Sequence, residues 1–184
     1  MRHWRVASAV AGLVWLAAAA AASPLEERVD ALVLDGFERP DAALARLEPL
    51  REPGDRSPAT SRLFLQAAGI IEAQAGRDRE AGANAERLLA LSRDAPDPLA
   101  GAASNLVRAL VAEAAGQFDV AAALAEAALN VYRPACPAAA ALGPACDWRA
   151  AWRALHVLER RSLSLGQWVD AHAQLQAAFD LADA

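Results

Sequence analysis

The chain has 184 residues, 55% of them hydrophobic, and its 18 basic and 23 acidic side chains give a formal net charge of −5 at pH 7. This length suits one domain with a single core, and the alanine-rich, aromatic-poor composition favours helices. The acidic balance disfavours nucleic acid or an anionic membrane surface as a partner.

The first predicted element is a signal peptide over residues 1–22. A short basic lead with Arg2 and Arg5 precedes an uncharged apolar run that ends in three alanines at Ala22, which is typical of a signal-peptidase site. An uncleaved anchor is the alternative, but the run of about 17 residues is at the lower limit for crossing a bilayer. Cleavage would leave a domain over 23–184, periplasmic or secreted, with a net charge of −7 and no membrane contact.

The best-formed helical segment runs over 97–129. Asp97 followed by proline is a typical helix start, because the carboxylate caps the first turn and proline needs no N–H there. Leu106 and Leu110 recur at helical spacing, and Gly116 suits a turn that requires positive φ. The apolar pattern then restarts, which predicts two antiparallel helices joined by a glycine turn.

The same signals recur along the chain at a constant spacing. In the last three segments, the capping residue lies 19 positions before the glycine. These pairs are Ser57 and Gly76, Asp97 and Gly116, and Asp147 and Gly166. Small or apolar residues follow each glycine at plus five, nine and twelve: Ala81, Ala85 and Leu88; Ala121, Ala125 and Ala128; Ala171, Leu175 and Ala178. The segment around Gly36 fits less well, with Asp41 and Glu48 at two of these positions.

This recurrence resembles the tetratricopeptide repeat family, whose units pair two helices and place a small residue seven positions before the glycine. Gly69 and Ala109 match that position, whereas Val29 and Glu159 do not. The glycine period is 40, 40 and 50 residues, longer than the family's usual period of about 34. The resemblance implies an all-α fold over 23–184: a right-handed stack of about four antiparallel helix-turn-helix repeats, or a TPR-like solenoid.

A longer interruption over 133–147 holds the only two cysteines, Cys136 and Cys146. In an exported chain, two cysteines that flank one loop most simply form a local disulfide, and two separate thiols are the alternative. A loop this short contributes roughly 2 to 3 kcal/mol in the chain-entropy model. The spacing lacks the further ligands of a metal site and the close C-x-x-C spacing of a redox pair.

The resemblance also implies an inner groove lined by the first helix of each unit. Carried over by position, its candidate ligand-binding residues are Leu106, Leu110, Arg153, His156 and Arg160. An apolar peptide or helix with an acidic group near the two arginines would suit this surface. Alternatively, the two leucines face neighbouring helices and belong to the core.

The fourth unit concentrates aromatic, arginine and histidine side chains between Trp148 and Arg161. Tryptophans at helical spacing most often fill the space between helices. His156 and His172 lack a third ligand, so we expect no metal site and no cofactor.

Three function classes follow. The first is an exported scaffold that binds a protein or peptide partner and has no catalytic activity. The second is a periplasmic sensory input domain, isolated or truncated, of a membrane signalling protein such as a diguanylate cyclase. An enzyme is the least supported class, because the scattered Asp, Glu and His residues form no convergent set. Apolar surface on the last repeat would also allow a homo-oligomer through the C-terminal repeat.

Overall fold

The computed structural model describes residues 24–51, 57–94, 97–136 and 146–182. The described residues form helices and no strand, which confirms the all-α expectation for this part of the chain. The predicted signal peptide over 1–22 lies outside the described residues.

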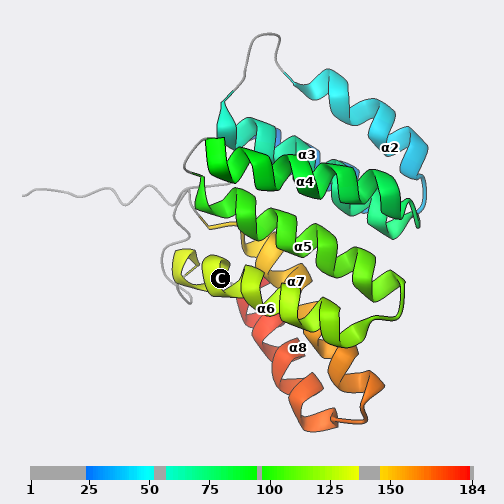
Figure 1. The fold of residues 1–184 in the computed structure, drawn as a ribbon, viewed down its shortest axis with the longest axis vertical. Helices are drawn as coiled ribbons and strands as arrows, with labels where there is room; N and C mark the ends of the chain where they lie inside the picture. Colours follow the sequence, from blue (N-terminus) through cyan, green and yellow to red (C-terminus); the bar gives the residue numbers. More distant parts are fainter. Residues whose placement is uncertain (1–23, 52–56, 95–96, 137–145, 183–184) are drawn as a thin grey trace, which may run out of the picture.

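The helices follow one another in the order α1 to α8, with one short 3-10 turn after α2 (Figure 1). Their bounds are α1 Pro24–Asp35, α2 Pro40–Leu47, η1 Glu48–Leu50, α3 Pro58–Gln74, α4 Asp78–Asp94, α5 Pro98–Ala114, α6 Phe118–Ala135, α7 Trp148–Ser164 and α8 Trp168–Ala182.

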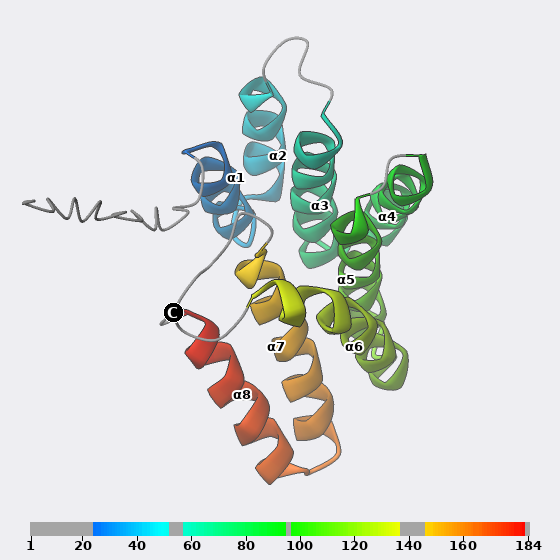
Figure 2. The same ribbon diagram turned by 90° about the vertical axis from the view of Figure 1, so that its left-hand side faces the viewer.

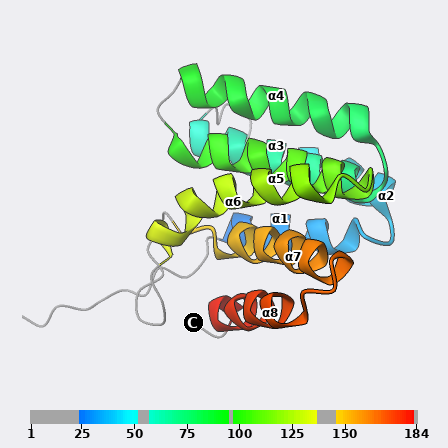
Figure 3. The same cartoon turned by 60° about the horizontal axis from the view of Figure 1, so that its bottom comes forward.

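Consecutive helices pack as four hairpins: α1 with α2, α3 with α4, α5 with α6, and α7 with α8. The first helices of successive hairpins also contact one another, α1 with α3, α3 with α5 and α5 with α7. Figure 2 shows α3, α5 and α7 around the middle of the molecule, with α4 and α8 at its outer sides, and Figure 3 shows α1 beside α7. We call the side formed by the first helices the inner face.

Glycine turns join the helices of the last three hairpins, as the spacing predicts. Gly76, Gly116 and Gly166 have φ values of 70°, 72° and 70°, a region that favours glycine because it has no Cβ. In each turn, the N–H after the glycine donates across the helix end at 2.8 Å, for example from Gln167 to the Ser162 carbonyl. Gly36 instead allows close packing, since a Cβ there would lie 2.8 Å from Ile71 Cγ1. The first hairpin therefore departs from the other three.

The predicted capping residues begin the first helices of these hairpins. The side chains of Ser57, Asp97 and Asp147 accept hydrogen bonds from backbone N–H groups in the first turns of α3, α5 and α7. These bonds satisfy donors that have no partner within the helix.

The small residues of the predicted seam are buried between helices. Eight of the nine are at most 4% exposed, and Leu175 is half-buried. Gly69 allows α3 to approach α5 closely, since an added Cβ would lie 2.9 Å from both Val107 methyl groups. Close approach of this kind explains why alanine dominates the seam and why glycine occupies position 69.

Candidate functional site

The two leucines of the predicted groove differ in their exposure. Leu106 on α5 is fully buried, so it has no surface to offer a ligand, and this favours its alternative role in the core. Leu110, one turn later on α5, is half-buried and packs against the same core cluster. The apolar part of the inner face thus stabilises the stack, and burial of such side chains contributes roughly 1.5 to 3 kcal/mol each.

Arg153 on α7 is engaged by a carboxylate from the first helix. Asp30 on α1 accepts a hydrogen bond from Arg153 Nη2 at 3.1 Å and pairs through its other oxygen with Arg149 Nε at 2.9 Å. All three side chains are largely shielded from solvent, with 12% to 28% exposure. An acidic group therefore does meet Arg153, as the sequence suggests for a ligand, but this group belongs to the chain itself.

Arg160 and His156, also on α7, face carboxylates as well. Arg160 Nε lies 2.6 Å from Glu113 Oε1 on α5, and His156 Nδ1 lies 3.0 Å from Glu159 Oε2. Burial raises the pKa of Glu113 above its usual value, and the nearby Arg160 opposes that rise. The His156 ring also meets Trp152 edge to face, with ring centroids 4.1 Å apart. Arg153 is thus shielded by Asp30, whereas Arg160 is 65% exposed and keeps N–H groups that do not face Glu113.

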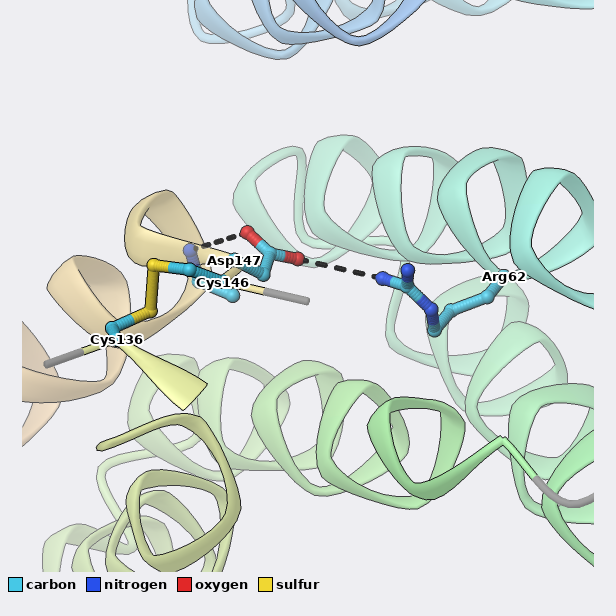
Figure 4. The surroundings of a disulfide bond; sticks show 5 residues. Arg62, Cys136, Cys146 and Asp147 are labelled. Carbon is cyan, nitrogen blue, oxygen red and sulfur yellow. Dashed lines mark hydrogen bonds and ion pairs between the residues drawn. A yellow bond between two sulfur atoms is a disulfide. The ribbon is translucent and has the colours of Figure 1, made fainter. Parts of the chain in front are cut away.

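A second polar network, which sequence reasoning missed, joins three hairpins. Arg62 Nε on α3 donates to Asp97 Oδ2 at 3.1 Å, and Arg62 Nη1 lies 3.6 Å from Asp147 Oδ2 (Figure 4). Gln66, one turn along α3, donates to the same Asp147 oxygen at 2.9 Å. The other oxygen of each aspartate caps its own helix, so each carboxylate joins a helix start to α3.

The disulfide lies directly beside this network. Cys136 and Cys146 are bonded, with their Cα atoms 4.7 Å apart, and Cys146 immediately precedes Asp147 (Figure 4). The predicted pairing is therefore confirmed. It fixes the residue after α6 to Cys146, which directly precedes the aspartate that caps α7.

Tyr132, one turn before Cys136 on α6, is fully buried. Burial raises the pKa of its phenol well above the usual value, with Asp147 adding to the rise and Arg62 opposing it. Its Oη has no hydrogen-bond partner among the described residues. The phenol therefore stays neutral and serves as packing beside the network.

A different surface is formed where α7 turns into α8. Leu163, Leu165, Trp168 and Val169 are 36%, 54%, 70% and 83% exposed. We call these four residues the apolar turn. The packing role expected for tryptophans applies to Trp152, which lies against the core, but not to Trp168.

Among the described residues, no group of three or more His, Cys, Asp or Glu side chains could hold a metal ion. None of the helices in the described ranges is both long and apolar enough to cross a membrane.

Comparisons with protein-family models, with curated proteins and with solved structures found no significant match to this chain. Its function has to be argued from its own residues.

Proposed function

We propose that the chain is an exported, TPR-like helical-repeat scaffold that binds protein through its fourth hairpin and has no catalytic activity. The constant spacing from cap to glycine and the four packed hairpins support the repeat architecture, a right-handed solenoid. The disulfide supports export, because such bonds persist in oxidising compartments.

The observation that carries the proposal is the apolar turn. Four large apolar side chains lie exposed within seven residues at one end of the array. Soluble proteins seldom expose apolar side chains in such a cluster unless it forms an interface. Trp168 is its largest member, and tryptophan is the residue most enriched among those that dominate binding energy.

The partner is a second copy of the chain. Copies of the cleaved chain, with a net charge of −7, repel one another over most of their surface. Residues 162–169, in contrast, read SLSLGQWV and carry no charge, so two copies can meet there without this repulsion. A two-fold interface would place Trp168 of each copy against the apolar turn of the other.

Sedimentation of the disulfide-bonded protein over a wide concentration range tests this interface. We expect dimers to form with rising concentration, and Trp168→Ser to weaken dimerisation roughly 30-fold. Phe37→Ser is the matched control, because Phe37 is 76% exposed at the turn between α1 and α2 and lies outside the apolar turn. A wild-type chain that is monomeric throughout, or an equal loss in the control, would overturn the proposal.

A further inference from the structure

A polar cleft lies between α6, α7 and α8, on a face of α8 other than the one that carries Trp168. Its volume is about 290 Å³, which is at the lower end of the range for small-molecule sites. The polar side chains around it are Arg133 of α6, Arg161 and Ser162 of α7, Gln167 before α8, and Asp170 and Gln174 of α8. Leu155 and small alanines complete the lining.

One part of the cleft offers positive charge. Arg133 makes no ion pair with any described residue, unlike the arginines of the inner face. Arg161 donates its Nε–H to the exposed Asp119, and a guanidinium has five N–H donors, so four remain for other partners. Two guanidinium groups that line one cleft are suited to a carboxylate.

The α8 side of the cleft offers acceptors. Gln174 Oε1 is buried and has no hydrogen-bond partner in the described part of the chain. A buried acceptor without a partner is destabilising, so a ligand that donates a hydrogen bond to it would remove this cost. Asp170 lies one turn before Gln174, lines the same cleft and adds a negative charge. These two acceptors suit an ammonium group.

We propose that this cleft binds a small zwitterion of the free amino-acid type. Arg133 and Arg161 would take its carboxylate, and Asp170 and Gln174 its ammonium group. The cleft holds groups of both signs, so a ligand with a single charge would leave one set without a partner. The volume admits a molecule of this size and no folded partner. The cleft shares Ser162 and Gln167 with the segment of the proposed dimer contact, but none of the four residues of the apolar turn lines it.

Isothermal titration calorimetry with each of the free L-amino acids, on the disulfide-bonded protein, tests the proposal. We expect at least one to bind, and its amide and N-acetyl derivatives, which lack one charge each, to bind at least tenfold more weakly. If no amino acid binds at millimolar concentration, or if either derivative binds equally well, the proposal is wrong.

Variants locate the site. Arg133→Ala and Asp170→Asn should each weaken binding roughly 10-fold or more. Arg79→Ala removes the same charge from an exposed side chain on α4 that faces Glu80, and it should leave affinity unchanged. Trp168→Ser should bind normally, which separates this site from the dimer interface. Circular dichroism checks that each variant is folded, and unchanged affinity in a folded Arg133→Ala protein would rule out this cleft.

Discussion

The two edges of the helical array are built in different ways. At the turn edge of the last three hairpins, the residue after each glycine donates a backbone hydrogen bond to the carbonyl five positions earlier, as Gln167 does to Ser162. At the cap edge, where α3, α5 and α7 begin, Arg62 bonds to Asp97, 35 residues away, and Gln66 bonds to Asp147, 81 residues away. Ion pairs join different hairpins at both edges, but Asp41, which pairs with Arg77 at the turn edge, is 87% exposed, whereas Asp97 and Asp147 at the cap edge are 14% and 20% exposed.

The difference shows that residues recurring at one spacing in the sequence can make either local or long-range contacts. Each turn uses the same glycine for the same local reason, so its structure repeats. The capping aspartates Asp97 and Asp147 also recur at this spacing, but the spacing does not predict that the second oxygen of each binds Arg62 or Gln66 on α3. Comparing variants at the two edges tests whether the long-range contacts or the local turns dominate stability.

The largest effect is expected from Arg62→Ala. The substitution removes the cation that Asp97 and Asp147 share, and these side chains are only 14% and 20% exposed. The free energy of unfolding should therefore fall by about 3 kcal/mol. Urea denaturation measures this loss.

The matched variant at the turn edge is Arg77→Ala, which removes an ion pair with the 87% exposed Asp41. Water screens that pair, so its loss should have little effect on unfolding. Equal losses in the two variants would show that the cap edge has no special role.

An intermediate effect on stability is expected from substitutions at two glycines, Gly166 and Gly82. A Cβ at Gly166 or at Gly82 would contact nothing within 4 Å, but Gly166 has a φ of 70° and Gly82 lies within α4. Gly166→Ala should therefore destabilise the protein by about 1 kcal/mol, and Gly82→Ala should stabilise it by about 0.5 to 1 kcal/mol. Thermal unfolding of both variants provides the check, and a change of the same sign in both would contradict this account of the turn.

Tyr132→Phe should change the free energy of unfolding least at neutral pH, because the phenol has no hydrogen-bond partner among the described residues. The folded-state pKa of Tyr132 lies above the usual value of 10, so its contribution to stability is complete below pH 10 and is lost as the pH rises further. The substitution should reduce this alkaline loss.

Absorbance of phenolate measures the ionisation directly, since Tyr132 is the only tyrosine. A transition near pH 10 in the folded protein would show that the phenol is accessible to water.

The local features of the fold could be predicted from the sequence. Caps, glycine turns and the buried seam depend on residues within one hairpin, and the cysteine pair flanks one loop. The pairing of Asp30 with Arg149 and Arg153 could not be predicted, because the partners lie about 120 residues apart and charged residues give no periodic signal.

The candidate groove was predicted less well than the fold. Position within a repeat placed Leu106, Arg153 and Arg160 on first helices, but it did not specify that Leu106 is fully buried or that both arginines face acidic side chains of the chain itself. Exposure of Trp168 was also missed, because helical spacing does not distinguish a buried aromatic from one at the end of the array.

The contact of Asp30 with Arg149 and Arg153 joins the first hairpin to the fourth. In arrays of stacked repeats, each unit contacts only its neighbours. Here an additional hairpin between α2 and α7 would separate the aspartate from its two arginines. Inserting or deleting a hairpin would therefore break this contact, whereas most point mutations would leave it in place.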